Sequence, residues 1–386
     1  MRDVAIVAYG ETKIALRSGR SAYDLAGEVM DQIIGRTAID KTEIDGVCVT
    51  ETLSQTENSF WPQYVCEMLG LSPTWLELVA LGGASPIGGV ARASAAIRAG
   101  FCRTALVIAA DGQLSGRPPE QGAHRFEFLY PTGLHGPVGA FGLIMQRYQH
   151  LYGLKDAALA KLAVTQRNHG LLNPNACDKL RVPLTEQDYL QSKRVSTPLR
   201  LLDSVLVCEG ANGVLLTSDD NARRLGLEMK VFPTSYAEQT HYNLAEPLAE
   251  ITESGFLSAG PRAFRQAGLT PKDIASFHPY DDFFMAVLLQ FEHLGFCERG
   301  QACDFVLDTD LSFRGKLPLN TGGGQISAGQ PRLAGGGVNL VEAVRQLFGE
   351  AGERQVANRR NAVVTGIGGI PYARNWATSA VLVLEQ

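Results

Sequence analysis

The sequence has no long hydrophobic run, no excess of positive charge and no closely paired cysteines, and each absence excludes a class of protein. Its apolar runs, such as residues 104–110, are far shorter than a membrane span. The formal net charge is −5 and the pI is about 5.9, without a basic stripe, which argues against a nucleic-acid partner. The seven cysteines are odd in number and scattered, and none forms a CxxC pair. We therefore expect no disulfide framework, no zinc site and no other metal in this chain.

The start of the chain also lacks the apolar core of a signal peptide, because the first residues lead directly into the strand-like residues 4–8. We therefore expect a cytoplasmic protein. With 386 residues, the chain is long enough to form two hydrophobic cores.

Segments typical of strands and helices alternate along the chain, which predicts a layered α/β fold. Ser21 can cap the first helix, because its side chain can accept a hydrogen bond from the first turn. The strands expected in the first half are residues 4–9, 45–49, 76–81, 104–110, 205–207 and 213–218, with 104–110 central and parallel and a turn at 209–213. The helices expected there are residues 21–34, 60–69, 82–99, 137–152 and 155–169.

Residues 112–136 contain several glycines and prolines and few periodic apolar positions, so we expect a long loop. Structureless loops of that length in a compact protein usually have a function, such as covering a site. Residues 173–198 are also polar and irregular. We therefore treat about 112–200 as a region inserted in the first half.

The second half of the chain repeats the order of the first, which predicts two similar domains. Each half has a polar lead-in before a strand, a glycine-rich turn before a helix of small residues, and then another strand. We expect the two glycine-rich turns to lie close in space. The matching segments are residues 41–47 with 271–277, 82–89 with 322–329, and 103–107 with 360–364.

These repeats divide the chain into an N-terminal half, residues 1–220, and a C-terminal half, residues 221–386. The first half would carry the inserted region. The second half would end with a strand at residues 378–384.

A histidine, a tyrosine and two aspartates stand together on the turn His278-Pro279-Tyr280-Asp281-Asp282-Phe283. The turn follows the apolar residues 274–277 and precedes residues 284–294, whose apolar positions recur at helical spacing. A turn between a strand and a helix is held at both ends and open on top, where α/β proteins place reactive groups. The alternative is a solvated polar turn without a chemical role.

Four blocks of sequence resemble the thiolase superfamily, and more closely its lipid-transfer, or sterol-carrier-protein-x, branch. Tyr280-Asp281-Asp282-Phe283 resembles that branch's His-Asp-Cys-Phe block, and Gly295-Phe296-Cys297-Glu298-Arg299-Gly300 resembles its downstream glycine. Leu317-Pro318-Leu319-Asn320-Thr321-Gly322-Gly323-Gly324 resembles its LPxNTxGG turn, and Glu342-Ala343-Val344-Arg345-Gln346-Leu347 resembles its EAVRQL helix. The resemblance covers essentially the whole chain. It implies a thiolase-like fold, with two similar α/β halves in a layered αβαβα arrangement.

The positions that match the catalytic residues of a thiolase carry other residues here. The nucleophilic cysteine at the start of the small-residue helix matches Gly83, and the second cysteine matches Gly366. The histidine of the Gly-His-Pro turn matches Gln330, and the histidine of the His-Asp-Cys-Phe block matches Tyr280. Without a thiolate, the usual acyl-enzyme cannot form.

Ser85 could act as a substitute nucleophile, but the sequence shows no histidine that would activate it. The nearest candidates are His124 and His135, both in the expected loop. Only a structure can place them.

The steroid side-chain aldolases of the lipid-transfer branch share these departures, since they also lack the nucleophile and carry Tyr-Asp at the position of Tyr280-Asp281. The resemblance implies an acyl-CoA C–C lyase that cleaves a β-hydroxyacyl-CoA by a retro-aldol step, with the coenzyme A thioester as its substrate. It also implies a homodimer and a partner protein with an OB-fold and a zinc ribbon. The chain departs from these aldolases at Gln330, where they carry a second tyrosine.

A retro-aldol step needs a base for the β-hydroxyl proton and donors for the enolate oxygen, and it needs no covalent intermediate. Gly83 would leave the oxyanion hole of a thiolase in place and make room for a larger substrate. Tyr280 could be the base or the acid, although an ordinary pKa of about 10 would need strong help. Gln330 cannot exchange protons, so its role would be donation to the oxyanion. Asp281 is either part of the catalytic set or a helix N-cap.

Two other functions stay open. One is acyl transfer on the same scaffold, through another residue or a residue of a partner. The other is a non-catalytic subunit that binds acyl-CoA or scaffolds an assembly. An open cavity lined by Gly83, Tyr280, Gln330 and Gly366 would favour an enzyme, whereas side chains that fill it would favour the non-catalytic subunit.

Overall fold

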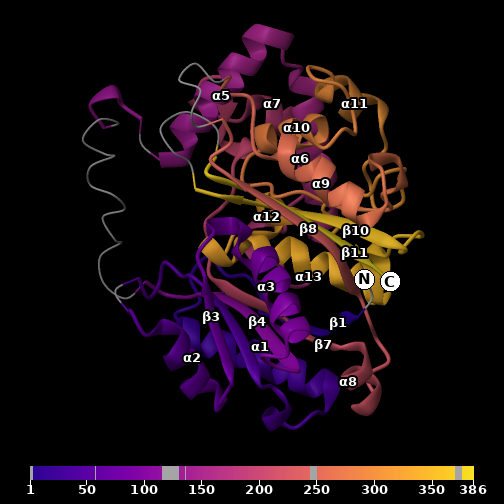
Figure 1. The fold of residues 1–386 in the computed structure, drawn as a ribbon. Helices are drawn as coiled ribbons and strands as arrows, with labels where there is room; N and C mark the ends of the chain where they lie inside the picture. Colours follow the sequence, from indigo (N-terminus) through magenta and orange to yellow (C-terminus); the bar gives the residue numbers. More distant parts are fainter. Residues whose placement is uncertain (1–2, 57, 115–129, 135, 244–249, 370–375) are drawn as a thin grey trace.

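The fold is a stack of two β-sheets and three layers of helices (Figure 1). The computed structural model describes residues 3–56, 58–114, 130–134, 136–243, 250–369 and 376–386. One layer of helices lies between the sheets, and each sheet has a further layer on its outer face. The expected αβαβα arrangement is confirmed.

The first sheet consists of β1 (Val4–Glu11), β2 (Gly46–Thr50), β3 (Trp75–Val79), β4 (Thr104–Asp111) and β7 (Gly210–Ser218), in the order β1-β7-β4-β2-β3. The strand β4 is central, as expected. It pairs parallel with β2 but antiparallel with β7, so the expectation of a parallel strand holds on one side only.

The outer face of the first sheet is covered by α1 (Ala22–Thr37) and α2 (Trp61–Leu69), and α8 (Asp219–Arg224) follows β7. The predicted Ser21 cap is confirmed, because its hydroxyl accepts from the backbone of Asp24 at 3.1 Å. The Asp24 carboxylate accepts from the Ser21 backbone in return, which completes a capping box.

The second sheet consists of β8 (Phe232–Thr240), β9 (Phe277–His278), β10 (Asn361–Gly368) and β11 (Thr378–Glu385), in the order β8-β11-β10-β9. Leu319 extends this order, because it pairs with Phe277 of β9 in a parallel bridge. The two sheets therefore repeat one topology, with β8, β11, β10, β9 and Leu319 in the places of β1, β7, β4, β2 and β3. The predicted duplication is confirmed.

The central layer contains α3 (Ser85–Ala99) and α13 (Gly335–Phe348), which lie between the sheets (Figure 1). Each follows a short 3-10 turn, Gly82–Ala84 before α3 and Arg332–Ala334 before α13. The structural counterpart of residues 82–89 is therefore 332–339. The predicted match with 322–329 was displaced by ten residues, because glycines are frequent in both segments.

The outer face of the second sheet carries helices from both halves of the chain (Figure 1). From the second half come α9 (Phe256–Ala267), α10 (Phe284–His293) and α11 (Ala302–Asp308). From the inserted region come α5 (Gly136–Tyr152), α6 (Asp156–Leu171), α7 (Glu186–Gln191) and the hairpin β5 (Arg194–Ser196) and β6 (Leu199–Arg200). The insertion thus belongs to the first half by sequence and to the core of the second half by packing.

Two local predictions were wrong. Residues 205–207 form no strand, and only Val207 makes an isolated bridge, to Gln330. The predicted turn at 209–213 is instead the first part of β7. Its small residues are needed there because a Cβ on Gly213 would lie 2.8 Å from the Val107 carbonyl oxygen of the neighbouring strand.

Most of the expected loop at 112–136 lies outside the described residues, including His124 and His135. Among the helices that are described, none has the length and apolar character needed to cross a bilayer. In the same part of the chain, no three His, Cys, Asp or Glu side chains gather into a group that could hold a metal ion. A cytoplasmic location and a domain boundary after residue 220 stay predictions.

Candidate active site

Tyr280 is held by its main chain on both sides. Its backbone N–H donates to Thr365 Oγ1 at 2.8 Å, and its carbonyl accepts from Gln290 Nε2 at 2.8 Å. The Thr365 hydroxyl in turn donates to the Gln290 side chain. Since Thr365 is on β10 and Gln290 is on α10, the turn is fixed to the sheet and to the helix that follows it.

The Tyr280 side chain crosses from the second half of the chain to the first and packs against Gly83. A Cβ atom on residue 83 would overlap the phenol oxygen and the adjacent ring carbons. The tyrosine is only 5% exposed. The predicted proximity of Gly83 and Tyr280 is confirmed, but the phenol fills the space beside Gly83 that a cysteine side chain would need.

Gln330 lies on the other side of the phenol, where its Nε2 donates to Tyr280 Oη at 3.3 Å. The same amide donates to Gln325 Oε1 at 3.2 Å. Both of its hydrogens are thus used within the protein, so the expected donation to an oxyanion would require one of these bonds to break. Because the Tyr280 oxygen accepts from Gln330, its own hydrogen is left to donate elsewhere.

The phenol is kept protonated by its surroundings. Burial raises the pKa of Tyr280 well above its usual value of about 10, and the nearby charges of Asp282 and Asp281 raise it further. The hydrogen bond from Gln330 lowers this pKa only in part. Tyr280 is therefore a hydrogen-bond donor at neutral pH and a poor base.

Asp281 caps a helix, although not the one that follows it in sequence. The N-cap of α10 is Phe283, whereas the Asp281 carboxylate accepts from the backbone of Gln325 at 2.9 Å and of Ile326 at 3.2 Å. Both groups belong to the first turn of α12 (Gly324–Ala328). The alternative role as a cap is thus favoured, with a helix more than forty residues downstream in sequence.

Side chains complete the shell around Asp281. Asn339 Nδ2 donates to its Oδ1 at 3.2 Å, and Gln166, with its amide nitrogen turned toward Oδ2, donates at 2.7 Å. Burial raises the pKa of Asp281 to about 7, although the donated hydrogen bonds oppose the shift. A carboxylate with this many donors is committed to holding the turn in place.

Asp282, the next residue, has no such shell. It is half-buried, and its Oδ1 is shielded from solvent and has no hydrogen-bond partner among the described residues. Burial, followed by the charge of Asp281, raises the pKa of Asp282 to about 8. Sequence reasoning gave this residue no role of its own.

The other positions singled out from the sequence do not carry a reactive group to the site. Gly366 lies against α3, since a Cβ there would be 2.5 Å from Ala84 Cα. The Ser85 hydroxyl accepts from the Leu81 backbone at 2.8 Å, and no described histidine is hydrogen-bonded to it. His278 is buried, its Nε2 contacts Ser276 Oγ at 3.2 Å, and burial lowers its pKa to about 4.

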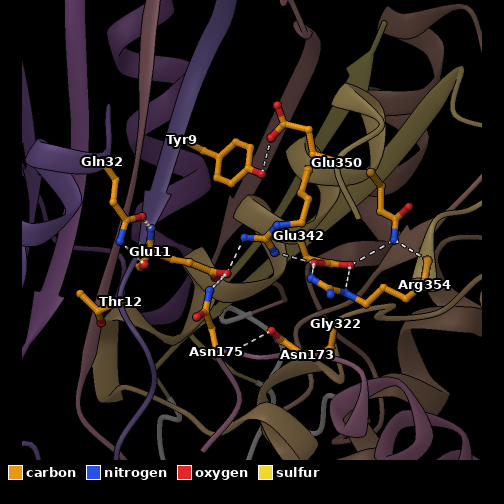
Figure 2. A network of polar contacts seen from close by, with 12 residues as sticks. Tyr9, Glu11, Thr12, Gln32, Asn173, Asn175, Gly322, Glu342, Glu350 and Arg354 are labelled. Carbon is orange, nitrogen blue, oxygen red and sulfur yellow. Dashed lines mark hydrogen bonds and ion pairs between the residues drawn. The ribbon is translucent and has the colours of Figure 1, made fainter. Parts of the chain in front are cut away.

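A buried network of charges contacts the glycine turn at residues 320–324, and Gly322 of this turn lies beside Glu342 and Arg354 (Figure 2). Glu342 accepts from Thr321 Oγ1 at 2.8 Å, from Arg345 at 2.7 Å and from Arg354 at 3.0 Å. The second nitrogen of Arg345 reaches Glu11 of the first half. Burial alone would raise the pKa of Glu342, but the charges of Arg354 and Arg345 outweigh it and hold the carboxylate ionised.

The sequence analysis missed the residues that position Tyr280 and Asp281. These are the four polar side chains Gln290, Thr365, Asn339 and Gln166. A signal was present, because Gln290 and Asn339 interrupt apolar helical stretches at positions that face inward. A buried amide on such a face needs a partner, which is often a backbone or carboxylate oxygen.

Comparison with known proteins identifies the family of the chain. Residues 237–386 match the family described as thiolase C-terminal domain-like. The 17-hydroxy-3-oxo-4-pregnene-20-carboxyl-CoA lyase of Mycobacterium tuberculosis is 30% identical, over 96% of this chain and 97% of that protein. A steroid side-chain-cleaving aldolase of Thermomonospora curvata is 31% identical, over 95% of each chain.

A solved structure, the Ltp2-ChsH2(DUF35) aldolase, also aligns along the whole chain. The TM-score is 0.87 at 28% identity, with 100% of this chain and 98% of that chain covered. The chain therefore belongs to the thiolase superfamily, in the branch that contains the steroid side-chain-cleaving aldolases.

Proposed function

We propose that this protein is an acyl-CoA C–C lyase that cleaves a β-hydroxyacyl-CoA by a retro-aldol step without a cysteine nucleophile. The proposal is supported by the two full-length relatives, and the absence of a cysteine nucleophile is supported by the packing at the two thiolase cysteine positions. Side chains that fill this space were also what a non-catalytic subunit predicts, so that alternative is kept in the test below. Gly83 is closed by Tyr280, and Gly366 is closed by Ala84, so neither position has room for a thiol. Two relatives of similar length are named as a CoA lyase and an aldolase, and another of similar length is named as an acetyl-CoA acetyltransferase.

The chain supplies a rigid donor to such a reaction. Tyr280 is fixed at its backbone by Thr365 and Gln290, and Gln330 sets the direction of its hydroxyl. A phenol held in this way can donate to an oxygen on which negative charge develops, with little reorganisation. We assign Tyr280 to that role and Gln330 to its orientation, and Gly83, which has no side chain, leaves the space that the Tyr280 ring occupies.

The bulky acyl groups named for the relatives suggest the first substrates to test. We propose a β-hydroxyacyl-CoA with a fused-ring side chain, because two full-length relatives are named for steroid side-chain chemistry. Acyl transfer of the thiolase type is the second candidate, favoured by the C-terminal family match.

We also propose a partner of the DUF35 type, with the OB-fold and zinc ribbon expected from the resemblance. Its support is the Ltp2-ChsH2(DUF35) aldolase, whose described chain superimposes over the full length of this one. Activity that requires the partner would explain a site in which the phenol fills the space beside Gly83.

A homodimer is the third part of the proposal. The strand β3 is at the edge of the first sheet, and within the described residues no strand pairs with its free side. Leu78 on this strand is 48% exposed, and Met68 on the adjacent α2 is 63% exposed. Edge strands with exposed apolar neighbours need covering. Light scattering at micromolar concentration should give twice the 41.6 kDa chain mass, and a monomer would contradict the proposal.

The test of function is incubation of the purified protein, with and without a DUF35-type partner, with a panel of β-hydroxyacyl-CoA thioesters from linear to fused-ring chains. Release of a shorter acyl-CoA together with a ketone or aldehyde is the expected result. Thiolysis of a β-ketoacyl-CoA by free CoA would instead favour acyl transfer. Binding of acyl-CoA without turnover in either assay would favour the non-catalytic subunit.

A further inference from the structure

We propose that the Asp282 carboxylate is the base that removes the β-hydroxyl proton in this reaction. The inference rests on the proposed function and adds to it the residue that accepts the proton. Tyr280, which was the first candidate for that role, is left as the donor that faces the same substrate.

The position of Asp282 is set by contacts on both sides. Its carbonyl accepts from the Val205 backbone at 3.2 Å, and Phe283 after it pairs with Ser204. The Phe283 ring stacks on Phe141, with 4.1 Å between centroids. The same segment, residues 204–206, also pairs with Gln330, because the Leu206 carbonyl accepts from the Gln330 backbone at 3.0 Å. Residues 204–206 therefore link the backbone of Asp282 to the backbone of Gln330, whose side chain contacts Tyr280.

The two neighbouring aspartates differ in what they do with their oxygens. Asp281 accepts from two backbone N–H groups and from two amide side chains. Asp282 Oδ1 is shielded from solvent and accepts from none of the described residues. An unpaired carboxylate oxygen is costly to bury, so a native example calls for a functional explanation. Of the two, Asp282 has the oxygen without a hydrogen-bond partner among the described residues, although the backbone N–H groups of Asp282 and Phe283 lower its pKa in part.

Asp282 also acts on Tyr280 more strongly than Asp281 does. Its charge is the second largest cause, after burial, of the raised pKa of Tyr280, and it exceeds the influence of Asp281. Asp282 and Tyr280 also stand two residues apart on the same turn between β9 and α10. With Tyr280 kept as a phenol and Asp282 able to ionise, the pair has a donor and an acceptor, which a retro-aldol step requires.

Asp282 takes the hydroxyl proton, the β-oxygen forms a C=O double bond, and the Cα–Cβ bond breaks with its electron pair passing to the thioester as an enolate. The ketone or aldehyde leaves. The Asp282 carboxylic acid then returns its proton to the α-carbon of the enolate, which gives the shorter acyl-CoA and restores the carboxylate. No oxidant, reductant or metal takes part.

The base must be ionised to act, so activity should depend on pH near the pKa of Asp282. The charge of Asp281 raises the pKa of Asp282, and Tyr280, two residues before it, stays protonated. In the 204–208 segment that pairs with this turn, Cys208 is the titratable side chain, and the segment is flanked by the acidic residues Asp203 and Glu209. Because burial raises the pKa of Asp282 to about 8, kcat should rise with pH up to about that value and then level.

The test compares Asp282→Asn with the wild-type protein and with Asp220→Asn, a control whose side chain is 94% exposed. With its partner and a β-hydroxyacyl-CoA that the wild type cleaves, Asp282→Asn should lose about a hundredfold or more in kcat. The KM and the affinity for acetyl-CoA should stay within about threefold, and the rising limb of the pH profile should disappear. Asp282→Ala should regain activity in added formate, which replaces the lost carboxylate, and Asp220→Asn should match the wild type.

Each other outcome overturns the inference. If the wild type cleaves the thioester and Asp282→Asn keeps its kcat and its pH profile, Asp282 is not the base, while the proposed function stands. If the variants do not fold, the wild-type pH profile decides, and a kcat that is flat between pH 6 and about 9 contradicts the inference. If the wild type cleaves none of the thioesters, the proposed function and the inference fail together.

Discussion

The two turns that precede the central helices have the same shape but different contents. Before α3, the Gly82–Ala84 turn carries no ionisable side chain, and it is fixed by Glu51, which accepts from Gly82 N at 2.5 Å. Before α13, the equivalent turn follows Gln330 and a glycine segment capped by Asp281. Gly336 at the start of α13 has no room for a Cβ, which would overlap the Gly83 carbonyl oxygen.

This difference shows that the two duplicated halves contribute different kinds of groups to the one candidate active site. The first half contributes closely approached backbone, and the second contributes every polar side chain that we assign to the reaction. A symmetric ancestor with one function in each half would be expected to keep reactive groups on both turns. The predictions below act on one turn or the other, and they are ordered by the size of the expected effect.

Glu342→Gln should have the largest effect on stability, because Glu342 contacts the glycine turn at residues 320–324 that precedes Gln330. It removes the charge that Arg345 and Arg354 share in a buried network, and breaking such a network costs about 3–5 kcal/mol. Denaturant unfolding should show the loss, and Glu298→Gln, on an exposed residue, should show none. An unchanged midpoint in Glu342→Gln would mean that the network does not hold the turn.

The same carboxylate predicts a pH dependence of stability. The pKa of Glu342 in the fold is well below the value of about 4.3 expected in the unfolded chain. The ionised group therefore stabilises the fold above that unfolded value, and its contribution is lost as pH falls below about 4. The difference in stability between wild type and Glu342→Gln should shrink in that acidic range.

Tyr280→Phe tests the donor that the second half sends across to the first. It removes one hydroxyl with little change in volume, so the fold and acyl-CoA binding should persist while turnover falls by about a hundredfold. Tyr64→Phe, on a residue that is 45% exposed, is the matched control. Turnover equal to wild type in Tyr280→Phe would end the role assigned to this phenol.

Gly83→Cys restores the residue type of a thiolase to the first turn and should cost less stability than Glu342→Gln. The new side chain must displace the Tyr280 ring, which costs about 1–3 kcal/mol of overpacking. Thiolysis should not appear, because the base positions at Tyr280 and Gln330 are still altered. Gly35→Cys, at a helix position with open space around it, is the control for the thiol itself. Thiolysis in Gly83→Cys would contradict this interpretation.

The fold was predictable because the spacing of apolar residues and the repeated segments can both be recognised in one sequence. Residues 41–47 and 271–277 each form a 3-10 turn and then a strand, as their matching lead-ins indicated. The turn expected at 209–213 failed because small residues there serve close packing. Asn212 of β7, for example, lies against Gly337 and donates to the Ala334 carbonyl.

The site was predictable only in part. The resemblance brought Gly83, Tyr280 and Gln330 together, and the structure places them in contact. The partners of Asp281 could not be read, since they come from α12 and α13, and only the fold makes them neighbours. Asp282 was passed over because a carboxylate without a partner is a property of three-dimensional surroundings.

The packing of the inserted helices has a consequence for how the chain is made. Phe141 and Tyr148 of α5 contact Phe283, the N-cap of α10, and Glu292 within α10, across a sequence separation of more than 140 residues. During synthesis the amino-terminal part emerges first. The apolar faces of α5 and α6 therefore stay exposed until α10 has been synthesised and can pack against them. A chain stopped near residue 220 would expose them to aggregation or to chaperones. The two halves, although built on one repeated plan, therefore mature as a single cooperative unit.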